Sequence, residues 1–438
     1  MKFILPARAF PRLALSPEEE YTIRSETDRT TKATRALFDE FAAQGRTLPA
    51  DQYTLMKTKD RLNAYRVNFS QDPTSSSYLA SPYSSSSSSN RSAGKSRTGE
   101  WVDPVPMKLV NRQGSHQSVD ERKPELHPRT SANSAGSATA GAPKVIVTGF
   151  VEGTIEDFAL SNIAETELLC KMRGAYVHDG NDDIRILAKI HGPTREDPFT
   201  FLGVKWASKR LSYFSLPNDM VYAESCGVVH DGRGTVTAAY HVLKSVEIAR
   251  IGNLEQFNVR RMRTSICTIV RKHDDRHVEI FCHASVPVQD NEPVNIASFE
   301  QTLIVSCDAL LHCAFVRKLM WLSQQKQAPR NSLLDESEAT SKMPVRYCRL
   351  CNKSLRGKLR GIFRPSNPCH CCRQIVCRTC TLDTNVVVDV AVDSVTQRAF
   401  PFCLQCVSEA NRLPASDVAR AAVVSNNYNA AIPRSKAK

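Results

Sequence analysis

Apolar side chains recur along this chain with two different periods, which predict an early helix, a series of strands and a long late helix. Ser16, Pro17 and Glu19 are typical of a helix N-terminus with a capping box. Apolar residues then recur three or four positions apart up to Phe41. Between residues 53 and 69, alternating apolar residues predict a pair of strands.

From Lys144 onward, strand-like apolar runs follow one another. The runs read KVIVTGFV, DIRILAKIH, FTFLGVKWA, MVYAESCGVV, VTAAYHVLKSVEI, TSICTIVRK and HVEIFCHASV. Apolar positions then return to helical spacing between Phe299 and Trp321. The pattern predicts an α+β fold in which a long, mostly antiparallel sheet packs on this last helix. The pattern is compatible with two kinds of packing between sheet and helix: a solid core, or a curved sheet that grips the helix over a ligand cavity.

Composition divides the chain further. Residues 72–143 are rich in Ser, Pro, Gly and basic residues, with six consecutive serines from Ser84. Such a segment buries too little apolar surface to offset its chain entropy, so we expect a disordered insertion. The predicted boundaries are a sheet domain at 16–325 that contains this insertion, a polar linker at 326–343, a cysteine module at 344–412 and a flexible tail at 413–438.

Eight of the fifteen cysteines form four Cys-x-x-Cys pairs, namely Cys348/Cys351, Cys369/Cys372, Cys377/Cys380 and Cys403/Cys406. Two intervening residues bring two thiolates within reach of one ion, so the pairs predict two zinc ions, each with four sulfur ligands. The short gap between the second and third pairs favours interleaved over sequential pairing. Interleaving assigns Cys348, Cys351, Cys377 and Cys380 to one ion and Cys369, Cys372, Cys403 and Cys406 to the other.

These zinc sites indicate recognition or anchoring, because four sulfur ligands leave no open position for a catalytic water. The spacing around His370 does not match a RING finger, and Cys371 is expected to be a spare thiol. No nucleophile elbow, phosphate loop, zinc-protease motif or dinucleotide fingerprint is present, so we expect no enzyme. His241 and His283 lie inside predicted strands and are interpreted as core or surface residues.

The distribution of charge and the absence of targeting segments indicate which partners the protein can have. The net charge is +13, and ten Lys or Arg residues but no acidic residue lie between Lys342 and Leu382. Part of this excess balances the zinc thiolates, and the rest can face an acidic membrane. Few aromatic residues accompany these cations, which argues against nucleic acid. Prolines 6 and 11 interrupt the start, and no apolar run reaches about 18 residues, so neither an export signal nor a membrane span is expected.

Two segments resemble known families. The spacing C-x2-C, x17, C-x2-C, x4, C-x2-C, x22, C-x2-C resembles the cross-braced, phosphoinositide-binding FYVE-type zinc finger, over Tyr347 to Val407. Upstream, EDPFTFLGVKW, DMVYAESCGVV, YHVLKSVEI and the helix ending in LMWL resemble a START-like lipid-binding domain. The combination, with its MKF-LP start, resembles a family of oomycete proteins. This resemblance implies a helix-grip fold with a lipid between sheet and last helix, and zinc on the eight cysteines.

The resemblance also concerns the headgroup site and the function. Residues Pro365 to Pro368 replace the basic signature of the FYVE-type finger, so Arg364, His370 and Arg373 remain as lipid-headgroup candidates. We therefore expect a non-enzymatic lipid-binding protein whose finger contacts a membrane or phosphoinositide. It would be cytoplasmic, with peripheral attachment to endosomal membranes. The alternative is a protein-interaction adaptor without a lipid ligand.

Overall fold

The computed structural model describes residues 2–6, 9–10, 13–68, 142–210, 216–289, 292–327, 347–355 and 368–425 of the chain. Most of the predicted insertion and linker lies outside the described residues, as does the headgroup candidate Arg364.

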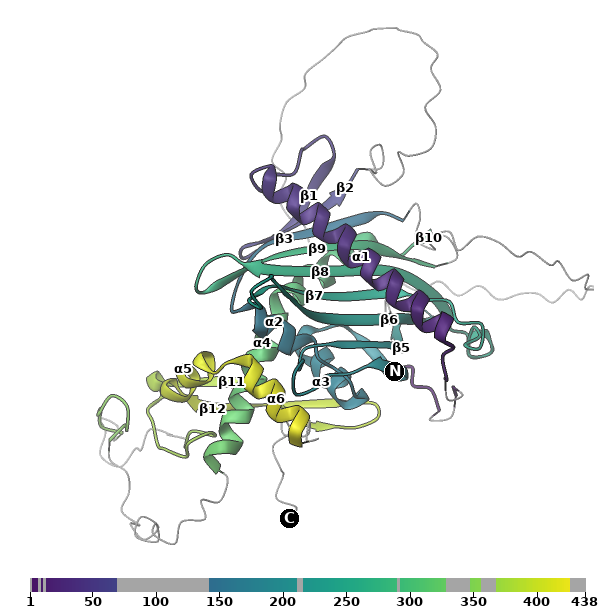
Figure 1. Cartoon of the computed structure of the whole chain (residues 1–438). Coiled ribbons are helices and arrows are strands. Elements are labelled where there is room, and N and C mark those ends of the chain that lie inside the picture. The colour runs from purple at the N-terminus through teal and green to yellow at the C-terminus, as the bar shows by residue number, and fades with distance from the viewer. Residues whose placement is uncertain are drawn as a thin grey trace, which may run out of the picture. The chain divides into compact units, whose positions relative to one another are not determined.

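A ten-stranded sheet forms the centre of the main domain, in the order β1-β2-β3-β9-β8-β7-β6-β5-β4, with β10 paired to β9 (Figure 1). Neighbouring strands are antiparallel, and β6 also makes a short parallel pairing with β8. The predicted strand pair and all the later strand-like runs are confirmed as strands. The bounds are β1 (Tyr53–Lys59), β2 (Leu62–Val67), β3 (Lys144–Glu152), β4 (Asn181–His191), β5 (Phe201–Arg210), β6 (Pro217–His230), β7 (Val236–Ser245), β8 (Arg260–Lys272), β9 (His277–Gln289) and β10 (Glu292–Pro293).

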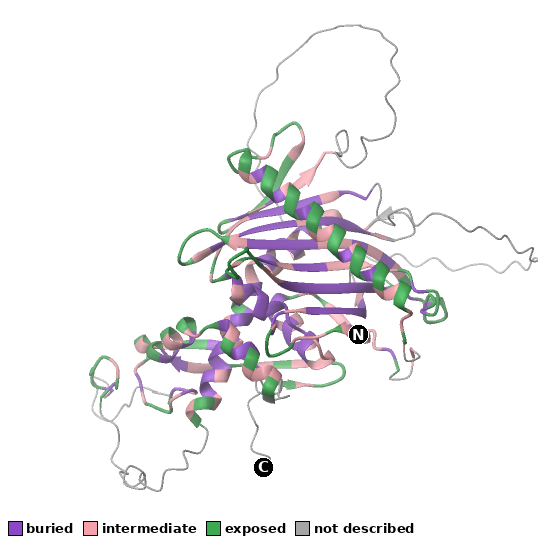
Figure 2. Ribbon diagram, viewed as in Figure 1, coloured by how far each residue is buried: buried purple, intermediate pink, exposed green. Residues whose placement is uncertain are grey.

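Helix α1 (Pro17–Ala43) crosses one face of the sheet over β6 to β9 (Figure 1). The predicted capping box is present, because Ser16 and Glu19 each bond the other's backbone N–H. Phe38 stacks on Phe281 of β9 at a centroid distance of 5.1 Å. The outward side of α1 is exposed, whereas the sheet beneath it is mostly buried (Figure 2).

Helix α4 (Ile296–Gln327) lies on the opposite face and packs on β1, β2, β3 and β9. Helices α2 (Ile155–Asn162) and α3 (Glu167–Val177) pack beside it. A sheet that wraps one long helix is the predicted helix-grip arrangement, so the α+β, helix-grip fold class is confirmed. Helices α2 and α3 were not predicted from the sequence.

The cysteine module contains the hairpin of β11 (Thr381–Val390) and β12 (Val395–Cys403), then α5 (Leu404–Arg412) and α6 (Ala415–Ser425). Two predicted boundaries are wrong. The linker cannot begin at residue 326, because α4 continues to Gln327. The tail is helical up to Ser425, because Ala415, Val418 and Ala419 are apolar at helical spacing and buried in the core that contains α2 and α4.

Candidate ligand cavity and metal centres

A cavity of about 340 Å³ lies between the sheet and the N-terminal half of α4. This volume is near the lower end of the range for small-molecule sites, about 300–1,000 Å³. Its apolar wall includes Met262 and Ile266 of β8 and Phe299, Leu303 and Leu310 of α4. The interface is therefore the cavity-containing alternative of the two packings considered, and the solid core expected of an adaptor is absent from this part of the described structure.

Strand periodicity explains how the sheet lines the cavity. Side chains two positions apart share one face of a strand. Met262, Thr264, Ile266 and Thr268 of β8 line the cavity, whereas the intervening Cys267 is buried with α1 on the other face. The same alternation directs Tyr222 and Glu224 of β6 to one face.

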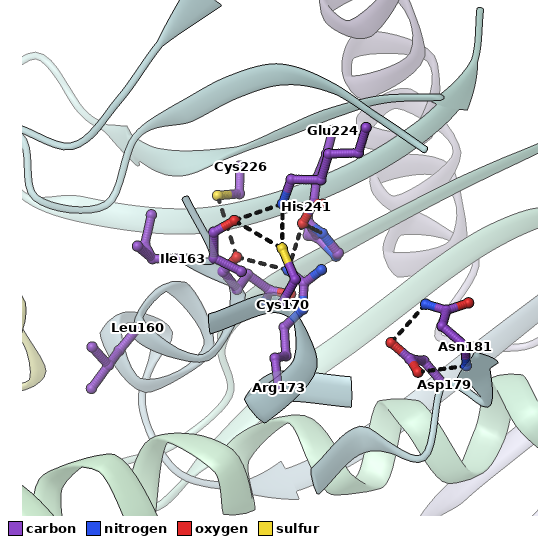
Figure 3. A network of polar contacts seen from close by, with 12 residues as sticks. Leu160, Ile163, Cys170, Arg173, Asp179, Asn181, Glu224, Cys226 and His241 are labelled. Atoms are coloured by element: carbon purple, nitrogen blue, oxygen red, sulfur yellow. Dashed lines mark hydrogen bonds and ion pairs between the residues drawn. The ribbon is translucent and has the colours of Figure 1, made fainter. Parts of the chain in front are cut away.

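A cluster of buried charged groups lies beside the cavity (Figure 3). Glu224 is fully buried, and its Oε1 accepts hydrogen bonds from Arg173 Nη1 of α3 and, at 2.9 Å, from His241 Nε2 of β7. Its Oε2 lies 2.7 Å from Lys205 Nζ of β5. Arg173 and His241 also line the cavity. Side chains from three elements thus converge on one carboxylate, which a fourth element, β6, carries.

The protonation states in this cluster follow from burial and charge. Burial opposes ionisation of Glu224, but the charges of Arg173 and Lys205 and the contact with His241 outweigh it and hold its pKa well below the usual value. Burial lowers the pKa of His241, against the opposing effect of Glu224. Burial also raises the pKa of Cys170, whose Sγ lies 3.2 Å from Lys205 Nζ. Two cations therefore face one carboxylate, a neutral imidazole and a protonated thiol.

Sequence reasoning missed this cluster. Arg173 lies on α3, which was not predicted, and His241 was interpreted only as a core or surface residue. A usable signal was the single charged residue inside each of two otherwise apolar strand runs, Lys205 and Glu224, because buried charges in strands are rare unless they are paired.

The eight paired cysteines form two groups of four, and within each group all Sγ atoms lie within 4.8 Å of one another. The groups are interleaved: Cys348, Cys351, Cys377 and Cys380 form one, and Cys369, Cys372, Cys403 and Cys406 form the other. Cys371 belongs to neither group and is buried.

The backbone positions both groups in the same way. Cys348 accepts a hydrogen bond from Asn352 N, and Cys369 accepts one from Arg373 N, each through its carbonyl oxygen at 2.9 Å. Asn352 and Arg373 have φ values of 55° and 64°, which close the two turns in the left-handed conformation. In the second group, Cys406 N donates to Cys403 Sγ at 3.4 Å at the start of α5.

These geometries fit a tetrahedral metal. With metal–sulfur distances near 2.3 Å, sulfurs at tetrahedral corners lie roughly 3.8 Å apart. The Sγ atoms of Cys351 and Cys377 lie 3.6 Å apart, and those of Cys372 and Cys403 lie 3.8 Å apart. Lys326 Nζ of α4 lies 3.7 Å from Cys406 Sγ, where it offsets thiolate charge. Both groups can therefore hold a metal ion through four thiolates.

Two of the headgroup candidates lie against α4. The His370 ring packs on Phe400 of β12 at 4.4 Å between ring centroids, with the two rings tilted by 44°. The His370 carbonyl oxygen accepts a hydrogen bond from Gln327 Nε2 at 2.6 Å. Arg373 is exposed, and its Nη2 donates to Gln327 Oε1 at 2.9 Å. His370 and Arg373 thus share one α4 residue as a partner.

Helices in the described part of the chain are too short or too polar to span a membrane.

No protein-family model and no curated protein matches the sequence.

Solved structures provide a further comparison. Human STARD10 matches with a TM-score of 0.34 and 8% identity, over 74% of this chain and 87% of that one. Human StAR-related lipid transfer protein 5 matches with a TM-score of 0.35 and 9% identity, over 66% and 97%. A STAR-related lipid transfer protein fragment from Xanthomonas axonopodis matches with a TM-score of 0.30 and 10% identity, over 60% and 97%.

Proposed function

We propose that this protein is a non-enzymatic lipid-binding protein that holds the apolar part of an amphipathic molecule between the sheet and α4. The observation that carries the proposal is the cavity of about 340 Å³ with apolar side chains from β8 and α4. Each buried methylene of a ligand contributes about 0.8 kcal/mol to binding. A binding role rather than a catalytic one is supported by Glu224, whose oxygens are held by Arg173, Lys205 and His241.

The first test identifies the ligand and blocks its site. Native mass spectrometry of the purified full chain is expected to show a co-purified lipid. Thr302→Phe places a ring in the cavity and is expected to lower lipid affinity at least tenfold. Thr237→Phe makes the same change at an exposed position of β7 outside the cavity and should leave affinity unchanged. The proposal would be refuted if the purified protein carried no lipid and also bound no added amphiphile.

For the cysteine module, we propose a divergent FYVE-type finger that holds two zinc ions and adds contact with an acidic membrane. Four-sulfur tetrahedral geometry is typical of structural zinc. Arg364, His370 and Arg373 remain the candidate headgroup contacts. Thiolate ligands require a reducing compartment, which supports a cytoplasmic protein with peripheral attachment to endosomal membranes.

Liposome binding tests this second role. The full chain is titrated with liposomes of varied phosphoinositide content, beside the double variant Cys369→Ser/Cys372→Ser. We expect the double variant and Arg373→Gln to bind acidic liposomes several-fold more weakly. Arg233→Gln, at an exposed turn between β6 and β7, should bind like the unmodified protein. Equal binding by all variants would reject the finger as the membrane contact.

A further inference from the structure

The polar residues at one end of the cavity indicate which headgroup the ligand has. This inference about the ligand rests on the proposed lipid-binding function. The side chain of Arg173 is more than nine-tenths buried and lines the cavity. Its Nη1 donates to Glu224 Oε1 and to the carbonyl oxygen of Asn162. Its Nε and Nη2 have no hydrogen-bond partner among the described residues.

A second donor lines the same cavity. Tyr222 of β6 is 2% exposed, and its hydroxyl has no hydrogen-bond partner in the described part of the chain. A buried tyrosine hydroxyl usually has a partner, because desolvation without one is unfavourable. Tyr222 lies two residues before Glu224 on the same face of β6, on the side of the charged cluster.

The charges around these donors do not cancel. Arg173 and Lys205 face the single carboxylate of Glu224, while His241 is neutral, which leaves one positive charge. Farther along the cavity lies a separate set of charges. Lys209 Nζ donates to the Asp179 carbonyl oxygen at 2.7 Å, and burial lowers the pKa of Lys209 against the opposing charges of Asp179 and Asp182. A buried net charge is costly unless an opposite charge accompanies it.

We propose that the cavity selects a single-chain amphiphile with an oxyanion headgroup, which accepts hydrogen bonds from Arg173 and Tyr222 and supplies the missing negative charge. The donors and the excess charge require an acceptor that is also an anion. The small volume fits one acyl chain better than two. The headgroup chemistry is shared by a fatty acid carboxylate and the phosphate of a lysophospholipid.

Binding to the delipidated full chain, measured by calorimetry, distinguishes the headgroups. Oleate, oleoyl lysophosphatidate and oleyl alcohol share one chain and differ in the headgroup. At least one of the two anions is expected to bind at least tenfold more tightly than the alcohol. The anion that binds more tightly shows whether the headgroup is a fatty acid carboxylate or a lysophospholipid phosphate. Acetate and inorganic phosphate should not displace it, because they lack the chain.

Two variants locate the selectivity. Tyr222→Phe removes a hydroxyl that makes no hydrogen bond to a described residue, so we expect the fold to be retained, and affinity for the anion should fall about fivefold with no change for the alcohol. Arg173→Gln should bring the anion-to-alcohol ratio close to one. Tyr240→Phe and Arg263→Gln are the matched controls, because neither residue lines the cavity and Arg263 pairs with Glu247 at the surface, and they should keep the ratio.

The outcomes separate the two proposals. Equal affinity for anion and alcohol in the unmodified protein overturns the oxyanion site but leaves lipid binding intact, whether or not Arg173→Gln folds. A ratio that persists in folded Tyr222→Phe and Arg173→Gln also overturns it, as does displacement by acetate or phosphate alone. Absence of binding for all three oleyl ligands overturns the lipid-binding function as well.

Discussion

At the residue scale, Glu224 is the group on which the buried cluster depends. Among the described residues it is the one carboxylate paired with Arg173 and Lys205, and its own side chain has no solvent exposure. Lys205 is equally buried, and its Nζ also donates to the Ala164 carbonyl oxygen at 2.6 Å. Removal of one partner from such a pair leaves an uncompensated charge in the interior, which is much less favourable than the loss of a surface pair.

Glu224→Gln should therefore lower the free energy of unfolding by about 3–5 kcal/mol. The measurement is urea denaturation of the zinc-loaded chain at pH 7.5. Glu247→Gln is the control, because Glu247 pairs with Arg263 at the surface with 73% of its side chain exposed. That change is expected to stay within about 0.5 kcal/mol. Similar losses for both variants would contradict the role assigned to Glu224.

His241 makes stability depend on pH, with a definite sign. Because its pKa in the folded protein lies below the ordinary value of 6.5, the unfolded chain takes up the proton first as pH falls. The free energy of unfolding is therefore at its highest with respect to this group above pH 6.5, and it decreases as the pH falls below 6.5. His241→Gln should show a smaller decrease between pH 7.5 and 5.5 in thermal or urea unfolding. The zinc centres contribute equally to both proteins, so equal slopes would contradict the prediction.

At the element scale, sequence periodicity was sufficient for strands β1 to β9 and for the long helices α1 and α4, but not for β10 or for the hairpin of β11 and β12. Their apolar residues repeat over many positions, and the cap at Ser16 is local in sequence. The short helices α2 and α3 have little periodic signal, although Thr154 and Asp157 form a capping box that could have indicated α2. Helix α6 was missed because its apolar spacing extends over only about three turns.

The two candidate sites differ in how far the sequence could predict them. The cysteine groups were predictable because each half of a site is a local Cys-x-x-Cys pair. The charged cluster was not, because Arg173 and Glu224 are 51 residues apart and meet only through the packing of α3 on the sheet. A sequence pattern carries local spacing, whereas this contact depends on tertiary structure.

One glycine is required by strand pairing. Gly149 of β3 pairs with Leu62 of β2 at a φ of 148°, and an added Cβ would lie 2.0 Å from the Arg61 carbonyl oxygen. Gly149→Ala should separate β2 from β3 and lower the free energy of unfolding by more than about 1 kcal/mol. Gly232→Ala, in the β6–β7 turn, meets no atom within 4 Å and should be neutral in the same urea assay. Equal stability of the two variants would contradict this account.

At the scale of the whole molecule, α4 belongs to both the cavity and the cysteine module. Its N-terminal half lines the cavity up to Leu310. Its C-terminal half, including Leu319 and Met320, is buried in one hydrophobic cluster with cysteines of both metal groups. Lys326 pairs with Glu409 of α5 at 2.5 Å, and Val387 N of β11 donates to the Tyr176 hydroxyl of α3 at 2.9 Å. The module is thus packed on the helix that closes the cavity.

Because both parts share α4, loss of zinc should destabilise the whole chain and also weaken ligand binding. Elemental analysis should find two zinc ions per chain. Cys369→Ser should lose the ion of its group, whereas Cys371→Ser, at the spare thiol, should keep both. Structural zinc contributes much of the folding free energy of small modules, so chelation is expected to lower Tm by about 10 °C or more.

The coupling itself is decided by the lipid assay. If α4 transmits the effect, zinc-depleted protein and Cys369→Ser should bind the lipid more weakly at a temperature where the sheet domain is still folded, and restoring zinc to the depleted protein should restore its affinity. Cys371→Ser should bind normally, because its metal groups are complete. Unchanged affinity in zinc-depleted protein would mean that α4 keeps its place on the sheet without the module, and that the two parts act independently.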